Sequence, residues 1–382
     1  MTKKSDAPAI RFKGFSDAWE QRKVQGVADR FDNLRIPVAA NLRVHGTTPY
    51  YGANGIQDYV EGFTHDGEFV LVAEDGANDL KNYPVKCVNG RIWVNNHAHV
   101  LQGKAGIADN SFLAFAISQS DIESLLVGGG RAKLNAETLM SIEFRLPCLQ
   151  EQYRIGEYLT QLNHLITLHQ RKFEKLTNVK KSMLEKMFPQ NGSSYPEIRF
   201  KGFTDPWEQR KFEEIAVRSS VICSDDTLPR VEYEDIVSGT GRLNKDIYAK
   251  QSIKSGIAFH QGDVLYGKLR PYLQNWLLPT FDGLAVGDFW VLQPQNADSS
   301  FLYRLIQSRQ FDEVANQSTG TKMPRADWKL VSKTVFSIPS NISEQAAIGT
   351  YFTALDSLIT LHQRELEKLQ NIKKSMLEKM FV

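Results

Sequence analysis

The stretch "HLITLHQRKFEKLTNVKKSMLEKMF" occupies residues 164–188, and nearly the same stretch, "SLITLHQRELEKLQNIKKSMLEKMF", returns at residues 357–381. Phe188 matches Phe381, so the two copies are offset by 193 residues. Internal repetition on this scale indicates an architecture built from duplicated units. The sequence therefore predicts that one long helix occurs twice in the chain.

Apolar residues recur along each copy at alternating steps of four and three residues, which is the heptad pattern of a coiled coil. One His and one Lys interrupt each line at matching places. An amphipathic helix packed on its own domain would explain one such line, but not two with the same polar interruptions. We therefore expect the helices to pair with each other, with His and Lys setting their register. The predicted seam comprises Ile155, Leu159, Leu162, Ile166, His169, Phe173, Leu176, Lys180, Met183 and Met187, and Ile348, Phe352, Leu355, Ile359, His362, Leu366, Leu369, Lys373, Met376 and Met380.

A second repeat precedes each globular body. "IRFKGFSDAWEQRK" at 10–23 returns as "IRFKGFTDPWEQRK" at 198–211, with twelve of 14 residues identical. Each long helix is entered through a proline followed by "EQ" and "IG", and Ser343 is a candidate N-cap for the second helix. The ends of each unit are thus copied, whereas the bodies between them barely match. This contrast predicts a common frame that carries two bodies with different tasks.

The bodies themselves have mixed character. Segments such as "GEFVLVAEDG" (67–76) and "RIWVNNHAHVLQ" (91–102) are predicted as strands, the latter from its alternating apolar residues. One helix is predicted in each body, at about 111–126 and 299–315. The fold class is therefore α+β, with two globular domains joined by two long antiparallel coiled-coil helices in a pseudo-twofold internal repeat.

Orientation follows from connectivity. The linker at 189–197 is short, so the second body lies at the C-terminal end of the first helix and the second helix starts there. The helices should run antiparallel, and Ile10 should lie near Phe381. The predicted divisions are 1–150 (first repeated segment and first body), 151–188 (central helix), 189–197 (linker), 198–342 (second repeated segment and body) and 343–382 (C-terminal helix).

Composition sets the broad class. The 382 residues are 42% hydrophobic and 24% charged, as in an ordinary globular protein. The net charge is only +2, so the overall charge does not indicate a polyanionic partner. Three cysteines, an odd number with no CxxC motif, favour reduced thiols. No stretch has the length of a membrane span, and no signal peptide is evident near the first residue. We expect a soluble cytoplasmic protein.

The repeated "WEQRK", the "EQ…IG" entry and the "KKSMLEKMF" exit of each helix resemble the specificity subunit of a type I restriction–modification system, as do the two unlike bodies. The resemblance covers essentially the whole chain. It implies a subunit without catalytic activity whose two target recognition domains each bind one half of a split, asymmetric DNA site, while the helices fix the gap. Implied partners are double-stranded DNA, two methyltransferase subunits and, through them, restriction subunits; S-adenosylmethionine, ATP and Mg belong to these partners, and no cofactor or metal to this chain.

Candidate DNA contacts are basic, aromatic or amide residues in loops, since Arg and Lys bind phosphate or guanine and Asn can pair with adenine. Glycine-bearing loops at 128–135 and 319–326 follow each body, and "GKLRPYLQNW" and "TPYYGANGIQDY" are the other clusters. Solvated loops, a strand rim or a plain turn would give the same patterns. The candidates are Arg131, Lys133, Lys322, Arg325, Lys268, Arg270, Tyr272, Tyr50, Tyr51 and Asn54.

Two other classes remain open. A stand-alone adenine methyltransferase is disfavoured, because "TDPWEQ" lacks the second proline of the methyltransferase motif and its copy reads "SDAWEQ". A nuclease is disfavoured because no Asp…Glu-x-Lys cluster stands out. His97 and His99 lack an evident Cys or carboxylate partner, so hydrogen-bonded strand histidines are expected rather than a metal site. The second alternative is a coiled-coil adaptor that binds only protein. The size of the bodies and their basic loops argue against it.

Overall fold

The computed structural model describes residues 8–128, 132–190, 192–249, 252–317 and 323–381. It comprises two compact units, unit 1 with residues 1–170 and 364–382 and unit 2 with residues 171–363. Helix α4 (Leu149–Lys186) begins in unit 1 and ends in unit 2, whereas α9 (Ile342–Met380) does the reverse. Within the described ranges no helix has the length and apolarity that a bilayer crossing requires.

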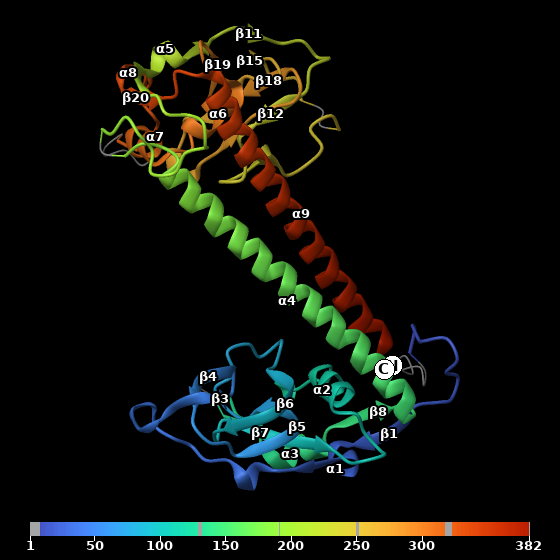
Figure 1. The fold of residues 1–382 in the computed structure, drawn as a ribbon. Coiled ribbons are helices and arrows are strands. Elements are labelled where there is room, and N and C mark those ends of the chain that lie inside the picture. The colour runs from blue at the N-terminus through green and yellow to red at the C-terminus, as the bar shows by residue number, and fades with distance from the viewer. Residues whose placement is uncertain (1–7, 129–131, 191, 250–251, 318–322, 382) are drawn as a thin grey trace. The chain divides into compact units, whose positions relative to one another are not determined.

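Unit 1 is built on a six-stranded sheet in the order β2-β7-β5-β6-β3-β4. All neighbouring strands are antiparallel except β3 and β6. Helix α2 (Asn110–Ser118) packs against β5 and β6, and lies between the sheet and α4 (Figure 1). The strands are β2 (Ala28–Arg30), β3 (His45–Gly52), β4 (Gly55–Val60), β5 (His65–Ala73), β6 (Val85–Val94) and β7 (Ala98–Gly103).

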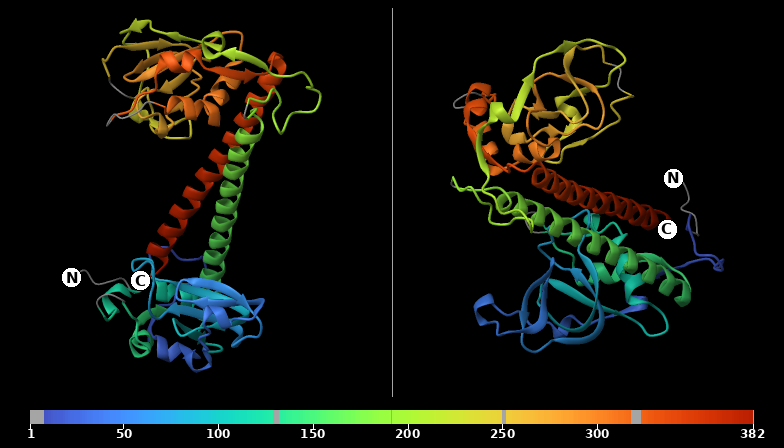
Figure 2. Two further views of the ribbon diagram at one scale, coloured as in Figure 1. Left: turned by 90° about the vertical axis from the view of Figure 1, so that its left-hand side faces the viewer. Right: turned by 45° about the horizontal axis from the view of Figure 1, so that its top comes forward.

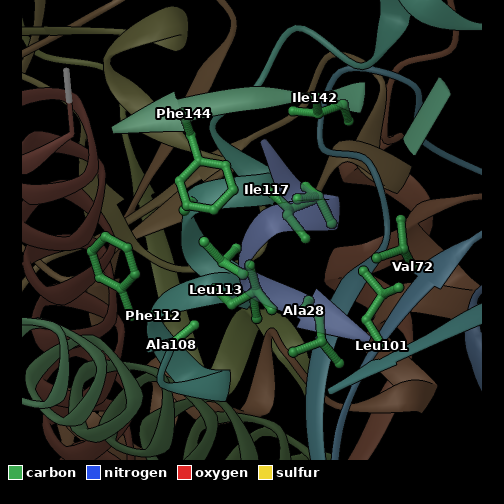
Figure 3. Packing of buried hydrophobic residues seen from close by; sticks show 14 of the residues in the cluster. Ala28, Val72, Leu101, Ala108, Phe112, Leu113, Ile117, Ile142 and Phe144 are labelled. Atoms are coloured by element: carbon green, nitrogen blue, oxygen red, sulfur yellow. The ribbon is translucent and has the colours of Figure 1, made fainter. Parts of the chain in front are cut away.

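The core of unit 1 joins this sheet to both long helices. Figure 3 shows Leu113 and Ile117 of α2 pointing towards Val72 and Leu101 of the sheet. Phe112 lies on another side of α2 and stacks on Phe381, with ring centroids 5.4 Å apart. Because all of these side chains except Phe381 are buried, α2 connects the variable sheet to the repeated frame.

Unit 2 has a different body. It contains two four-stranded sheets, ordered β10-β19-β16-β17 and β11-β15-β18-β12, and a small β13-β14 hairpin. The two bodies therefore differ in sheet topology, as expected from their dissimilar sequences. The strands are β10 (Ala216–Ser219), β11 (Ile222–Cys223), β12 (Arg230–Glu232), β13 (Ile236–Val237), β14 (Arg242–Leu243), β15 (Gly256–Phe259), β16 (Val264–Gly267), β17 (Trp276–Leu277), β18 (Gly283–Val286) and β19 (Phe289–Pro294), and the helices are α6 (Ser299–Leu305), α7 (Arg309–Ala315) and α8 (Trp328–Lys333).

The long helices are antiparallel, as predicted. In unit 1 the start of α4, with Ile155 and Leu159, shares a core with the end of α9, including Met376 and Met380. In unit 2 the end of α4 shares a core with the start of α9, and the contributing residues are Leu176, Val179, Met183, Leu184, Met187, Ile348, Phe352 and Leu355. Predicted seam residues near both helix ends therefore lie in the cores of the two units.

The repeated segments form the same small structure in each unit. Strand β1 (Glu20–Lys23) pairs with β8 (Glu143–Leu146), and β9 (Glu208–Lys211) pairs with β20 (Val335–Ile338), in each case antiparallel. Short helices follow β1 and β9, namely α1 (Val24–Val27) and α5 (Phe212–Ile215), while α3 (Ala136–Ser141) precedes β8 as α8 precedes β20.

Each repeated segment also caps the end of a long helix. The N–H of Ile10 donates to the carbonyl of Lys379 at 3.0 Å, and that of Ile198 donates to Lys186 at 2.9 Å. The N-terminal segment therefore lies beside the end of α9, as expected (Figure 2). Since the last carbonyls of a helix lack partners within it, these bonds satisfy exposed acceptors.

A buried ion pair fastens each repeated segment to the start of the other helix. Arg11 binds both carboxylate oxygens of Glu151 at 2.7 Å, and Arg199 binds those of Glu344 at 2.7 and 2.8 Å. The two carboxylates are 0% and 2% exposed. A buried carboxylate is stable only when paired, so the "IRF" and "EQ" motifs require each other.

The glutamine of each "EQ" motif holds the body's helix. The side-chain oxygen of Gln152 accepts the N–H of Asp109 at 3.0 Å, and that of Gln345 accepts the N–H of Asp298 at 2.9 Å. Asp109 and Asp298 are the N-caps of α2 and α6. The glycine of "IG" permits this approach, because a Cβ on Gly156 would lie 2.7 Å from the Asp109 carboxylate.

Four local expectations are corrected. The segment at 91–102 is not one strand: β6 ends at Val94 and β7 begins at Ala98, because "NN" at 95–96 makes a turn. The helix expected at 111–126 ends at Ser118. That expected at 299–315 is two helices, because Ser308 accepts the N–H of Phe311 and caps a new one. The N-cap of α9 is Asn341, whose side chain accepts the N–H of Ser343 at 2.8 Å.

We predict that Gly349→Ala destabilises the protein by about 1–3 kcal/mol, because the new Cβ overlaps the Ser300 side chain. This cost should exceed the gain of roughly 1 kcal/mol from the higher helix propensity of alanine. Chemical denaturation followed by circular dichroism measures the change. Gly26→Ala is the matched control, since nothing lies within 4 Å of its added Cβ. Equal stability of the two variants would contradict the close-packing role of the "IG" glycine.

Candidate nucleic-acid interface

Four of the candidate contacts come together in unit 2. The loop at 268–275 connects β16 to β17, and residues 323–326 run alongside it. The N–H of Arg270 donates to the carbonyl of Pro324 at 2.7 Å, and that of Ala326 donates to Lys268 at 2.9 Å. Two segments far apart in sequence thus form one surface, to which Lys268, Arg270, Tyr272 and Arg325 belong.

Asp288 lies at the base of this surface. Lys268 approaches its carboxylate at 3.5 Å and Arg325 at 3.1 Å. Burial raises the pKa of Asp288, but the hydrogen bonds and charges of Arg325 and Lys268 outweigh that effect and the pKa lies below its usual value. Lys268 and Arg325 are thereby partly neutralised, whereas Tyr272 is 57% exposed and Arg270 has no ion pair among the described residues.

The corresponding loop of unit 1 is fastened to the sheet. Lys133 pairs with Glu74 at 2.8 Å and forms isolated β-bridges with Asp75 and Val127. The N–H of Leu134 donates to the carbonyl of Glu74 at 2.7 Å. Lys133 is still 45% exposed, so it can face a ligand while its ammonium group is oriented by Glu74.

A buried charged network supports this attachment. His99 is 1% exposed, with Nδ1 2.7 Å from Asp32 and Nε2 2.9 Å from the carbonyl of Leu134. Arg35 binds Glu74 at 2.6 Å. Burial raises the pKa values of Asp32 and Glu74, but hydrogen bonds outweigh it, from His99 and Val100 for Asp32 and from Lys133 and Arg35 for Glu74, so both pKa values lie below normal.

The histidines are hydrogen-bonded, as expected. His97 Nδ1 lies 2.6 Å from Asp75, so both histidines do have carboxylate partners, which the sequence did not reveal. Within the described ranges no group of three or more His, Cys, Asp or Glu residues is arranged to hold a metal ion.

The aromatic and amide candidates of unit 1 are placed differently from the basic ones. Tyr50 and Tyr51 are buried, 1% and 6% exposed, and the Tyr50 hydroxyl accepts the N–H of Val38 at 2.9 Å. The Asn54 amide donates to the carbonyl of Gly76 and accepts the N–H of Asn78. The two tyrosines are therefore packed inside the body, whereas Asn54 is exposed and its amide makes two turn-forming bonds. Arg131 and Lys322 lie outside the described residues.

Sequence reasoning missed the acidic partners. Asp288 and Glu74 orient the cations of the two surfaces, but neither lies near its cation in sequence. Arg325 is 37 residues from Asp288, and no motif connects them. The contact is made by strand pairing, which a single sequence does not display.

The chain matches the family described as "Type I restriction modification DNA specificity domain" twice, at residues 16–178 and 206–371. These matches span most of the chain, so the chain belongs to this family, as the repeated motifs predict. Membership gives it a role in recognising DNA sequence.

Individual relatives agree. A putative type I restriction enzyme specificity subunit of Haemophilus influenzae is 44% identical over 146 residues, spanning 38% of each chain. The MjaVIII specificity subunit of Methanocaldococcus jannaschii is 22% identical over 303 residues, which is 72% of this chain and 70% of that one. The crystal structure of a type I restriction–modification S subunit from M. genitalium has the same fold, with a TM-score of 0.71, 14% identity and coverage of 98% and 99%.

We predict that Glu74→Gln lowers the unfolding free energy by about 2 kcal/mol at pH 7, because Lys133 and Arg35 lose their ion pairs with Glu74. A carboxyl whose pKa is depressed by folding stabilises the protein above its unfolded pKa, and this contribution is lost as pH falls through the folded value. The difference between variant and wild type should therefore shrink below about pH 4, near the ordinary glutamate pKa of 4.5. Urea denaturation at several pH values measures it. Exposed Glu137→Gln is the control, and a pH-independent difference would contradict the assignment.

Proposed function

We propose that this chain is the non-catalytic DNA-reading subunit of a type I restriction–modification complex. The body of unit 1 reads one half of a split, asymmetric site, the body of unit 2 reads the other, and the helix pair sets the unread gap. The observation that carries the proposal is one frame, with the same ion pair, glutamine and helix cap, built around two bodies of different sheet topology. Unlike bodies suit unlike half-sites.

The basic surfaces of the two bodies are the proposed DNA contacts. Lys133 in unit 1 and Lys268, Arg270, Tyr272 and Arg325 in unit 2 occupy loops tied to strand ends. Oriented cations on loops are the common means by which proteins hold phosphates and base edges. Arg131 and Lys322 remain candidates from sequence alone.

Adenine methylation and ATP-dependent cleavage are assigned in this proposal to partner subunits, which also hold S-adenosylmethionine, ATP and Mg. The buried carboxylates beside the unit 1 loop support a structural role for this part of the chain, since Glu74 pairs with Lys133 and Arg35 and Asp32 pairs with His99. The proposed location of the complex is the cytoplasm.

Two copies of the methyltransferase subunit are proposed to dock on the long helices. Leu165 and Leu168 of α4 are 40% and 38% exposed, and their repeat counterparts Leu358 and Leu361 of α9 are 44% and 52% exposed. Identical apolar pairs at equivalent positions suit two copies of one partner, because each copy meets the same surface.

A body exchange tests the reading function. Replacing residues 24–145 with the first body of another family member should change one half of the methylated sequence and leave the other half intact. Methylome sequencing of cells that contain the chimera and its methyltransferase subunit reports both halves. A chimera with both halves altered would refute the assignment of one half-site to each body.

We further predict that Leu165→Ser with Leu168→Ser lowers the number of bound methyltransferase subunits from two to one, and that Leu358→Ser with Leu361→Ser does the same. Native mass spectrometry counts the copies. Leu34→Ser with Leu42→Ser, which alters exposed leucines of the first body, is the control. Two copies bound to the fourfold helix variant would exclude this surface.

A further inference from the structure

The loop at 268–275 contains two residues in an unusual backbone conformation. Arg270 has φ +48° and Gln274 has φ +55°, and they flank the 3₁₀ turn Pro271–Leu273. Only one other described residue besides glycine has a positive φ, Asn296. Left-handed backbone is unfavourable for arginine, and a residue before proline is further restricted towards extended conformations.

The surrounding backbone holds Arg270 in this conformation. Its N–H donates to Pro324 at 2.7 Å, and its carbonyl accepts the N–H of Leu273 at 2.8 Å. At the other end of the turn, the carbonyl of Gln274 accepts the N–H of Gly239 at 3.0 Å. Strain that is maintained by bonds on both sides marks functional positions more often than accidental ones.

The side chain of Arg270 is also incompletely satisfied. Its Nε is buried and has no hydrogen-bond partner, and within the described ranges its guanidinium makes no ion pair. Its neighbours differ, because Lys268 and Arg325 share Asp288. The backbone of Arg270 is thus fixed, while its permanently charged fork of donors has no acceptor among the described residues.

We infer that Arg270 reads a guanine in the half-site bound by unit 2, donating to O6 and N7 at the major-groove edge. This inference rests on the proposed function and adds the identity of one base and the residue that reads it. A phosphate contact needs charge but little orientation, and an unstrained Lys or Arg supplies it. A bidentate base contact needs the guanidinium at a fixed position and angle. The strained turn, whose backbone is hydrogen-bonded at both ends, fixes the backbone from which this side chain projects.

Exposed Tyr272 supports this assignment of the surface. It lies two residues from Arg270 in the same turn and is 57% exposed, so it is accessible to a ligand that Arg270 contacts. The surface therefore combines Arg270, which has no ion pair among the described residues, with Lys268 and Arg325, which both pair with Asp288.

The test uses the full-length chain together with its methyltransferase subunit, and methylome sequencing reports the recognised motif. With Arg270→Ala, one guanine position of one half-site should become degenerate, with discrimination at that position falling about tenfold or more, while the other half-site is unchanged. Arg309→Ala is the control, because Arg309 lies elsewhere in unit 2 and pairs with Glu313. An unchanged motif, a uniform loss of methylation at an unchanged motif, or a unit 2 half-site without G·C pairs would each overturn the inference.

A second variant separates reading from folding. Arg270→Gly relieves the left-handed strain, so its melting temperature should exceed that of Arg270→Ala by a few degrees while the same guanine position is lost. Asn296→Gly, at φ +52°, should leave the motif unchanged. If the wild-type complex methylates no defined sequence, the proposed function fails; if it does so but Arg270→Gly keeps the guanine, only the present inference fails.

Discussion

A buried carboxylate at the start of each long helix constrains the rest of the structure. Glu151 and Glu344 are almost fully buried, and a charge in that position is tolerated only with a well-oriented counter-ion. Arg11 and Arg199 supply it, and each arginine lies next to the residue whose N–H caps the end of the other long helix. One ion pair therefore brings together the beginning of one helix and the end of the other.

The neighbouring glutamine extends this constraint to the bodies. Gln152 and Gln345 bind the backbone of the residues that cap α2 and α6, so the start of one helix in each body is fixed directly to the start of a long helix. The sheets then need only present an apolar surface to that helix. This explains how a six-stranded sheet and a pair of four-stranded sheets fit the same frame, and why sequence can diverge at the loops that are proposed to bind DNA.

The sequence predicts the frame well because its determinants are local or copied. Heptad spacing, the duplicated "EQ" and "IG" motifs and the strands before each proline are all visible as patterns, and the antiparallel arrangement follows from the short linker. The bodies are less predictable. Tyr50 resembles an exposed loop aromatic until β3 is paired with β4 and β6, and Asp288 has no visible relation to Arg325 until the loops meet. Such contacts depend on long-range pairing, for which one sequence contains no periodic signal.

The two copies of the frame share backbone geometry and the buried Arg–Glu ion pair, but they differ in the charges along the helix seam. In unit 2, Lys180 pairs with Asp356 at 2.6 Å, and Asp356 also binds buried Arg304. In unit 1 the repeat counterparts are Lys373, Asn163 and Phe115, and burial lowers the pKa of Lys373. The charges of the seam are therefore specific to each unit, whereas the exposed leucine pairs are identical. A partner that binds both copies equally has to recognise the surface that was copied, so the outward face of the helices suits it better than the seam.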